Sequence, residues 1–262
     1  MYIIGLTGGI ACGKSSIAEL LRKLGARTFD IDKETHKLLN PGGELYDIYV
    51  RHFHRRILKD DGEINKSMIA DIIFNNYKER QWINSVAHPI LLNRTRDFLV
   101  KCANAGELLV VLEIPLLFEA GWEFLVDEVW AVHVNRSKQI WRLMQRDKVD
   151  WEDAELRINA QMSADEIAAR ADVVINNKSS GNYKIIRSQV LRVVRQRLPA
   201  FITINEGNLK NLYIKRTKNK SDVVNLAESQ ENISNDSNSN ADNLRSDTTS
   251  ANAENVISVP VP

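Results

Sequence analysis

The stretch that decides the fold is Tyr2–Ser15, which reads YIIGLTGGIACGKS. The apolar run Tyr2–Leu6 has the composition of a buried strand, and Gly8–Ser15 fits the pattern GxxxxGK(S/T). Beyond it, leucine and isoleucine recur at helical spacing until Gly25, a residue type that commonly ends helices. A strand, a glycine-rich turn and a helix in this order predict a P-loop, a backbone cradle for the phosphates of a nucleoside triphosphate.

Each kind of residue in the predicted cradle has a task. Glycines let the backbone curl so that its N–H groups point at phosphate oxygens, and the following helix adds the positive end of its dipole. We expect Lys14 to reach the β- and γ-phosphates and the Ser15 hydroxyl to ligate Mg²⁺. The alternative is a glycine turn followed by a chance Lys-Ser pair, which the flanking strand and helix disfavour.

Four further apolar runs alternate with helical stretches along the chain. They are rich in valine, leucine and isoleucine and cover Ala26–Ile31, Leu108–Ile114, Glu128–Val134 and Val173–Ile175. This alternation predicts an α/β fold, in which a five-stranded parallel sheet is flanked by helices and joined by right-handed crossovers.

Two long segments show helical patterns without a strand. Residues 41–105 are too many for one crossover helix, so we expect a helical subdomain that walls a substrate cleft. Residues 136–170 form the second segment, of which about 136–165 is expected to act as a lid. The sequence thus predicts one domain over residues 1–201 and a tail over 202–262. Seven asparagines and six serines among residues 227–255 predict that this tail is disordered.

The composition excludes several classes of protein. A net charge of +1, and the mildly basic body left when the acidic tail is set aside, are too weak to indicate nucleic-acid binding. The longest apolar stretch, Leu108–Phe118, contains Glu113 and Pro115 and is too short for a membrane span. No signal peptide is recognisable, and Cys12 and Cys102 make neither a disulfide scaffold nor a zinc motif. We expect a cytoplasmic monomer or weak oligomer that binds neither nucleic acid nor membrane.

A phosphate cradle leaves open what is done with the nucleotide. The guanine-reading NKxD of GTPases is absent, because the nearest match, Asn177–Ser180, lacks the aspartate. A small kinase remains, and it needs a base for the acceptor hydroxyl. Asp30 and Asp32 follow the second predicted strand, where an extended segment would turn both to one side. Either carboxylate could accept the proton, and either could instead cap the following helix.

A kinase also uses cationic side chains to neutralise transition-state charge. Lys138, Arg142 and Arg146 recur every four residues and form one basic helix face in the second helical segment. This face is a candidate for lid arginines that close over the phosphates. The alternative is an ordinary solvated helix surface.

Several short motifs together resemble those of the dephospho-CoA kinase family. The resemblance spans Ile3 to about Leu198 and rests on the order and spacing of the P-loop and of Phe29–Asp32 (FDID), His88–Ile90 (HPI), Pro115–Glu119 (PLLFE) and Arg142–Arg146 (RLMQR). It implies a P-loop kinase fold with a helical CoA subdomain and a helical lid. It further implies transfer of the ATP γ-phosphoryl group, with Mg²⁺, to the ribose 3′-hydroxyl of 3′-dephospho-CoA, the last step of CoA biosynthesis.

The resemblance also assigns roles to single residues. Asp32 matches the catalytic carboxylate, and Arg142 and Arg146 match the lid arginines. Lys14 of the P-loop completes the set of expected catalytic residues. His88 and Leu116 are expected on the substrate side, although a histidine packed at a helix end remains an alternative for His88. The ATP contacts comprise the P-loop and a turn near the adenine: Gly8, Gly9, Ala11, Cys12, Gly13, Lys14, Ser15, Ser16 and Asn176.

The sequence departs from the family pattern at three places. Ala11-Cys12 stands where Gly-Ser is common, and Ser16 replaces a threonine; the loop should still form if Ala11 can take the required backbone angles. Cys12 lies near a helix N-terminus, so we expect a lowered pKa and a thiol that reagents alkylate unless ATP protects it. His54 follows Phe53 where glycine is usual, which leaves the conformation of that loop open.

Two other functions remain open. One is another P-loop small-molecule kinase, of the nucleoside or nucleotide type, that acts on a different hydroxyl. The PLLFE and His-Pro motifs speak against it. The other is a nucleotide-binding regulator that has lost catalysis, and the presence of Lys14, Asp32 and Arg142 together speaks against that.

Overall fold

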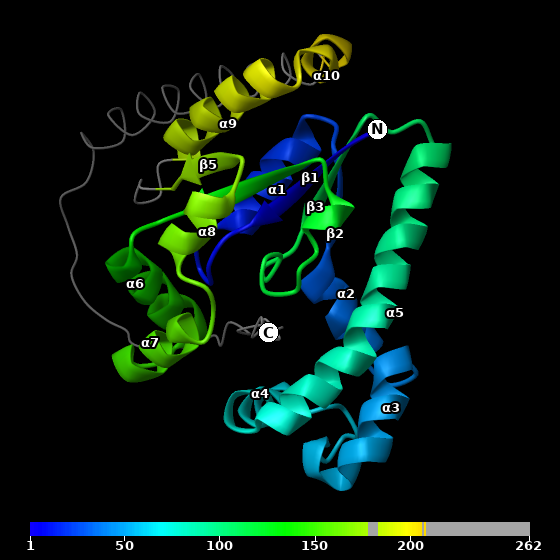
Figure 1. Ribbon diagram of the computed structural model, residues 1–262. Helices are drawn as coiled ribbons and strands as arrows, with labels where there is room; N and C mark the ends of the chain where they lie inside the picture. The colour runs from blue at the N-terminus through cyan, green and yellow to red at the C-terminus, as the bar shows by residue number, and fades with distance from the viewer. Residues whose placement is uncertain (178–182, 206, 208–262) are drawn as a thin grey trace, which may run out of the picture.

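The five predicted strands form one parallel sheet. The computed structural model of the 262-residue chain describes residues 1–177, 183–205 and 207. The strands pair in the order β2-β3-β1-β4-β5, all parallel, which confirms the predicted sheet (Figure 1). Their bounds are β1 (Tyr2–Thr7), β2 (Arg27–Asp30), β3 (Leu109–Glu113), β4 (Glu128–His133) and β5 (Val173–Asn176).

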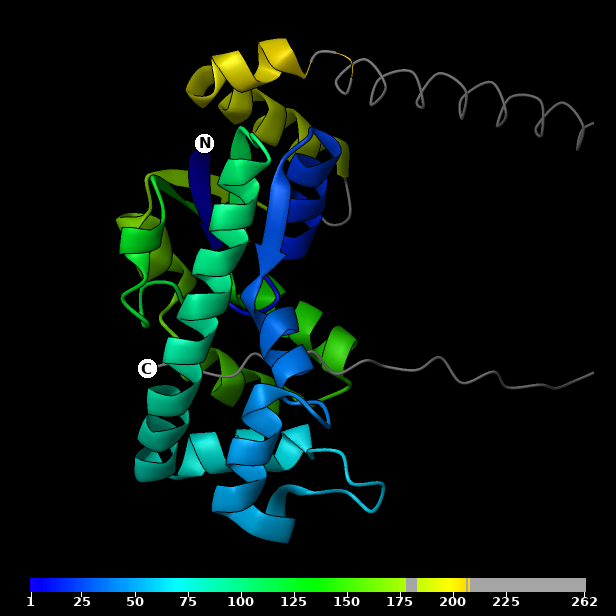
Figure 2. The ribbon, with the colours of Figure 1, turned by 90° about the vertical axis from the view of Figure 1, so that its right-hand side faces the viewer.

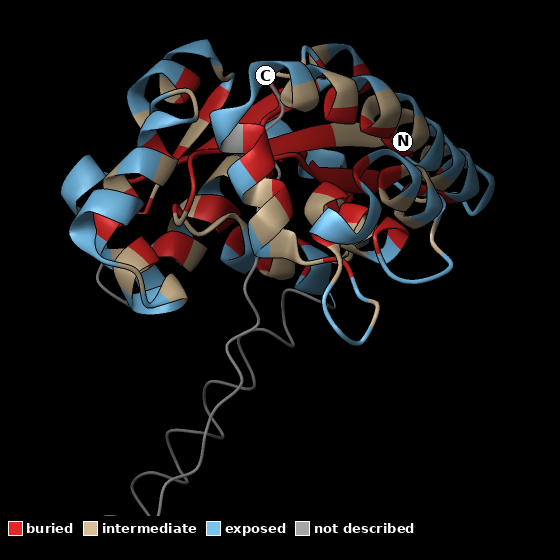
Figure 3. Cartoon of the chain, turned by 90° about the horizontal axis from the view of Figure 1, so that it is seen from below, coloured by how far each residue is buried: buried red, intermediate tan, exposed pale blue. Residues whose placement is uncertain are grey.

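Helices flank the sheet on both faces, and the interior strand β3 is buried on both sides. Val110 and Leu112 share one core with α2 and α5, whereas Leu109 and Val111 share a second core with α1 and α9. Side chains alternate across a strand, so a strand between two helical layers is apolar throughout. Figure 3 shows the buried strands between helices whose outer faces are exposed. The helices are α1 (Lys14–Lys23), α2 (Ile31–Leu38), α5 (Tyr77–Asn104) and α9 (Tyr183–Arg197).

The segment between β2 and β3 is helical, apart from an isolated bridge between Leu58 and Ile64. Figure 2 shows α3 and α4 beyond the carboxyl end of the sheet, with α5 running back along it. Parallel sheets bind ligands at this end, so the helical segment lies where a substrate would be held. Besides α2 and α5 it contains α3 (Glu44–Phe53), η1 (His54–Ile57) and α4 (Lys66–Asn75).

A second group of helices lies between β4 and β5. The side chain of Asn135 caps α6 by accepting a hydrogen bond from the N–H of Lys138, and Lys148 ends the helix with φ 57°. No helix in the described part of the chain is long and apolar enough to cross a membrane. The group consists of α6 (Arg136–Asp147), α7 (Trp151–Asn159) and α8 (Ala164–Arg170), and the turn η2 (Glu123–Leu125) precedes β4.

The last described helix is α10 (Pro199–Ile204). Proline at its first position suits a helix start, and Phe201 is buried in the core beneath α9. Helical structure therefore continues past residue 201, where the sequence analysis places the end of the domain. The predicted tail lies outside the described residues from 208 onward.

Candidate active site

The P-loop forms its cradle through three residues with positive φ. Gly8 has φ 141°, Gly13 φ 96° and Ala11 φ 59°. Glycine takes such angles without steric cost, whereas alanine loses about 1–2 kcal/mol there. A Cβ on Gly8 would lie 2.5 Å from the carbonyl oxygen of Val132, so no larger residue fits. Ala11 thus takes the angles that the loop requires.

The N-terminus of α1 faces this loop. Gly13 is the N-cap residue and has no side chain to satisfy the N–H groups of the first turn. Those donors and the helix dipole together form a binding site for anionic oxygens. Ser15 and Ser16 are exposed at this end of the helix, where the sequence analysis expects ATP.

Lys14 lies between the loop and charged side chains from three other elements. Its Nζ donates hydrogen bonds to two carbonyl oxygens of the loop, at 2.8 and 3.2 Å. Burial lowers the pKa of Lys14, the nearby Asp32 and Glu113 carboxylates act in the opposite direction, and Arg146 adds to the lowering. The charges of Asp32, Glu113 and Arg146 therefore all act on Lys14 at the carboxyl end of the sheet.

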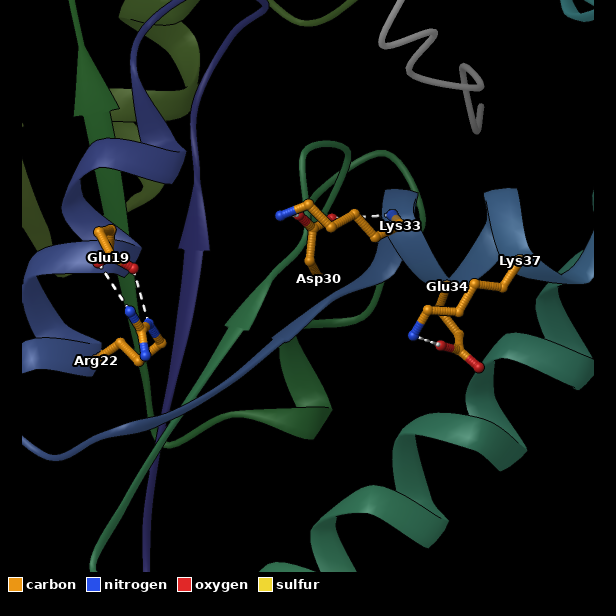
Figure 4. A network of polar contacts seen from close by, with 6 residues as sticks. All are labelled: Glu19, Arg22, Asp30, Lys33, Glu34 and Lys37. Carbon is orange, nitrogen blue, oxygen red and sulfur yellow. Dashed lines mark hydrogen bonds and ion pairs between the residues drawn. The ribbon is translucent and has the colours of Figure 1, made fainter. Parts of the chain in front are cut away.

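The structure separates the roles of the two aspartates. Asp30 is the N-cap of α2: its side chain accepts from the N–H of Lys33 at 3.1 Å and pairs with the Lys33 ammonium at 3.0 Å (Figure 4). The helix-cap interpretation is thus correct for Asp30. The prediction that Asp32 lies in an extended segment is wrong, because α2 begins at Ile31 and Asp32 belongs to its first turn. The cap starts the helix one residue after the strand ends, and the Asp32 carboxylate in the first turn acts on the pKa of Lys14.

Glu113 is a site residue that the sequence analysis missed. It ends β3 in register with Leu6 of β1 and Asp30 of β2, so it lies between the two strands that lead to the P-loop and to Asp32. Burial, with the Asp30 charge, raises the pKa of Glu113 to about 7, although Lys14 and a hydrogen bond with Ser15 act against the rise. The sequence signal that could have identified Glu113 is an acidic residue at the end of an apolar run predicted to be a buried strand.

Arg142 of α6 contacts the P-loop directly. Its Nη1 donates to the carbonyl oxygen of Cys12 at 3.3 Å, and its Nη2 donates to the side-chain and main-chain oxygens of Asn177 at 3.2 and 3.4 Å. A solvated helix surface does not account for these contacts. The structure therefore brings the first predicted lid arginine to the nucleotide loop.

The second lid arginine belongs to an ion-pair group. Arg146 and Arg157 both pair with the buried Asp147, at 2.6 and 3.0 Å, which joins α6 to α7. The next turn connects this lid to two loops. The N–H of Ile10 donates to Gln161 at 3.2 Å, and the N–H of Met162 donates to Glu119 at 3.0 Å.

Of the two asparagines after β5, the second contacts the P-loop. Asn176 is the last residue of the strand and is half-buried. Asn177 is only 4% exposed, and its Nδ2 donates to the carbonyl oxygen of Cys12 at 2.7 Å. In the sequence, Asn177 follows Asn176 in the expected turn near the adenine and begins the segment that lacks the aspartate of a GTPase motif, but no local signal links it to the P-loop. The role of Asn176 near the adenine stays a prediction.

The prediction for the Cys12 thiol is wrong. Its side chain is fully buried, and burial raises the pKa of Cys12 although Lys14 and Arg142 act in the opposite direction. Loss of solvation outweighs the favourable field of the nearby helix N-terminus. We therefore expect an unreactive packing cysteine in the folded protein.

The expected substrate-side residues lie around the loop that follows β3. Thr7 Oγ1 donates to the carbonyl oxygen of Pro115 at 3.0 Å, which joins the P-loop strand to this loop. Leu116 is only 4% exposed and packs in the interior. His88 lies edge-on to Trp122 with ring centroids 5.4 Å apart, and its Nε2 is buried without a hydrogen-bond partner. Ligand contacts of Leu116 and His88 stay predictions.

The fold and the site together define a class of protein. A P-loop at the first strand, an aspartate at the second, an acid at the third and arginines from a helical lid are the parts of a small-molecule P-loop kinase. The particular family follows from a match of residues 2–182 to the family model described as dephospho-CoA kinase. The chain belongs to the dephospho-CoA kinase family.

Individual relatives agree with this assignment. The dephospho-CoA kinase of Carboxydothermus hydrogenoformans is 39% identical over 194 residues, which cover 74% of this chain and 93% of that protein. The solved structure of dephospho-CoA kinase from Campylobacter jejuni is 29% identical with a TM-score of 0.54, covering 79% of this chain and 98% of that one. The structure of TT1252 from Thermus thermophilus is 29% identical with a TM-score of 0.64, covering 75% and 97%.

Proposed function

We propose that this protein transfers the γ-phosphoryl group of ATP to the 3′-hydroxyl of 3′-dephospho-CoA, which gives CoA and ADP. The observation that carries the proposal is that Lys14 and Arg142 both contact the P-loop, through hydrogen bonds to the carbonyl oxygens of Gly8 and Cys12. The charge of the Asp32 carboxylate also acts on Lys14. Membership of the dephospho-CoA kinase family supplies the acceptor.

The residues divide the work of phosphoryl transfer. The N–H groups of the P-loop and of the first turn of α1 hold the phosphates, and Lys14 exchanges its contacts with loop carbonyls for phosphate oxygens. Arg142 and Arg146 neutralise the charge that spreads over the transferred group. Asp32 accepts the proton of the acceptor hydroxyl.

Mg²⁺ is proposed to accompany ATP at Ser15 and Glu113. Hard cations prefer oxygen ligands, and Mg²⁺ commonly uses one or two protein groups together with substrate phosphates and water. The Ser15 hydroxyl beside the buried Glu113 carboxylate offers such a partial site. When bound, the ion neutralises charge on the β- and γ-phosphates.

The setting of the protein is part of the proposal. We place it in the cytoplasm as a monomer or weak oligomer that binds small molecules rather than nucleic acid. Supporting this, Cys12 and Cys102 are both free and buried, as suits a reducing compartment.

The activity is tested by ADP release from MgATP, with 3′-dephospho-CoA compared against adenosine, pantetheine and shikimate. We expect that 3′-dephospho-CoA alone accelerates ADP release. Acceleration by another acceptor instead would favour a different small-molecule kinase, and no acceleration by any acceptor would favour a nucleotide-binding regulator.

Asp32→Asn serves as the matched variant. It should lower kcat by about 10²–10⁴-fold while MgATP affinity stays within a few-fold, because this carboxylate serves the acceptor. Loss of MgATP binding in that variant would give Asp32 a metal-linked or structural role.

A further inference from the structure

The carbonyl oxygen of Cys12 links the P-loop to two side chains outside it. Asn177 Nδ2 donates to this oxygen at 2.7 Å, and Arg142 Nη1 donates at 3.3 Å. A P-loop turns its N–H groups toward the phosphates, so its carbonyl oxygens need donors from the surrounding protein. Cys12 obtains one donor from the end of β5 and one from the lid.

Asn177 uses both ends of its amide in this arrangement. The nitrogen holds the loop, while the side-chain oxygen accepts from Arg142 Nη2 at 3.2 Å. The reverse orientation would set the amide oxygen against the Cys12 carbonyl, so these contacts fix its direction. Its main-chain N–H donates to the carbonyl oxygen of His133 at 2.8 Å, which fastens the residue to the sheet.

The amide is also packed closely against the loop. Asn177 is 4% exposed, and a Cβ on Gly13 would lie 2.4 Å from its Nδ2 and 3.8 Å from Arg142 Nη1. The guanidinium therefore lies beside the residue that caps α1, where phosphates are expected. A buried side chain fixed at three points has little freedom to move with the lid.

We propose that Asn177 is a positioning residue, which holds the Arg142 guanidinium against the P-loop so that it is in place for the transferred phosphoryl group. This inference rests on the proposed function, because it takes Arg142 to act on that group. An arginine side chain that is already held in place before the reaction does not have to lose conformational freedom as the transition state forms, and this lowers the barrier. Loss of Asn177 should therefore act on turnover, and mainly through Arg142.

A double-mutant cycle on kcat tests the proposal in the full-length protein. The proteins are wild type, Asn177→Ala, Arg142→Ala and the double variant. In the wild-type background, Asn177→Ala should lower kcat about tenfold and leave the KM for 3′-dephospho-CoA unchanged. In the Arg142→Ala background, the same substitution should lower kcat by less than about twofold. Losses that multiply would overturn the proposal, since Asn177 would then act independently of Arg142.

A matched control separates positioning from general support of the loop. Gln161 also holds the P-loop, but its side chain does so by accepting a hydrogen bond from the N–H of Ile10, on the other side of Ala11 from Cys12. The cycle between Gln161→Ala and Arg142→Ala should give losses that multiply. Coupling as strong as that of Asn177 would show that any change to the loop affects Arg142, and would also overturn the proposal.

Two further arrangements keep the result interpretable. If Asn177→Ala does not fold, judged by its melting curve, Asn177→Leu carries the cycle, because it fills a similar volume and removes both the donor to Cys12 and the side-chain acceptor for Arg142. If wild type shows no ADP release with 3′-dephospho-CoA, the proposed function fails by itself. The cycle is then measured on the Kd for MgATP, where coupling supports the positioning role and independent effects overturn it.

Discussion

At the scale of single residues, the least expected feature is the buried carboxyl of Glu113. It is 7% exposed, and its pKa of about 7 lies above the usual 4.5. A raised folded-state pKa gives stability that is complete below pH 4.5 and is lost as the pH rises toward 7, because the unfolded chain ionises first. In ligand-free protein the loss amounts to about 3 kcal/mol of unfolding free energy.

Glu113→Gln should remove this pH dependence. Urea unfolding in the presence of a chelator, at pH 5 and pH 8, measures the difference in unfolding free energy between variant and wild type. We expect the variant to gain stability relative to wild type by about 2–3 kcal/mol between the two pH values. A difference that does not change with pH would mean that Glu113 is ionised in the folded protein throughout this range.

At the scale of elements, the turn between α3 and η1 contains backbone strain. His54 is exposed and has φ 55° and ψ −148°, a region that only glycine enters readily. The sequence raised this position because histidine stands where glycine is usual, and the structure shows that the chain keeps the glycine-like turn.

His54→Gly should therefore stabilise the protein. Release of strain worth about 1–3 kcal/mol outweighs the roughly 0.5–1 kcal/mol of added chain entropy in the unfolded state. Thermal melting and urea unfolding should show a net gain of about 1 kcal/mol. The control is His54→Ala, which keeps a Cβ and should gain nothing; equal gains in both variants would assign the effect to the imidazole and not to the backbone.

At the scale of the whole molecule, the family match ends well before the chain does. The family model covers residues 2–182, and the last described core residue is in α10. A chain ending at residue 207 should keep kcat within twofold and its melting temperature within a few degrees, because the missing sequence is poor in apolar residues.

A second truncation, after residue 226, serves as its control. It removes the asparagine- and serine-rich sequence but keeps the basic stretch Lys210–Lys220. A fall in activity or melting temperature with the shorter chain alone would show that this basic stretch contacts the body. A fall with both chains would assign the role to the acidic sequence beyond it.

The site shows which features sequence reasoning could reach. The P-loop and the five strands were predicted because their signals are local: glycine spacing and runs of apolar residues. The choice between Asp30 and Asp32 needed the family resemblance, and the structure added that a cap at Asp30 starts α2. The Cys12 prediction went wrong because proximity to a helix end is visible in the sequence, whereas burial is not.

The sequence by itself determined a P-loop at the first of five parallel strands, two helical segments and the family to which the chain belongs. These follow from spacing along the chain, which local backbone preference and side-chain periodicity convert into structure. Only the tertiary structure decided that Glu113 lies between β1, which leads to the P-loop, and β2, which leads to Asp32, and that Asn177 joins Arg142 to Cys12. Strand order and the packing of the lid bring these residues together, and neither can be deduced from the separation of the residues along the chain.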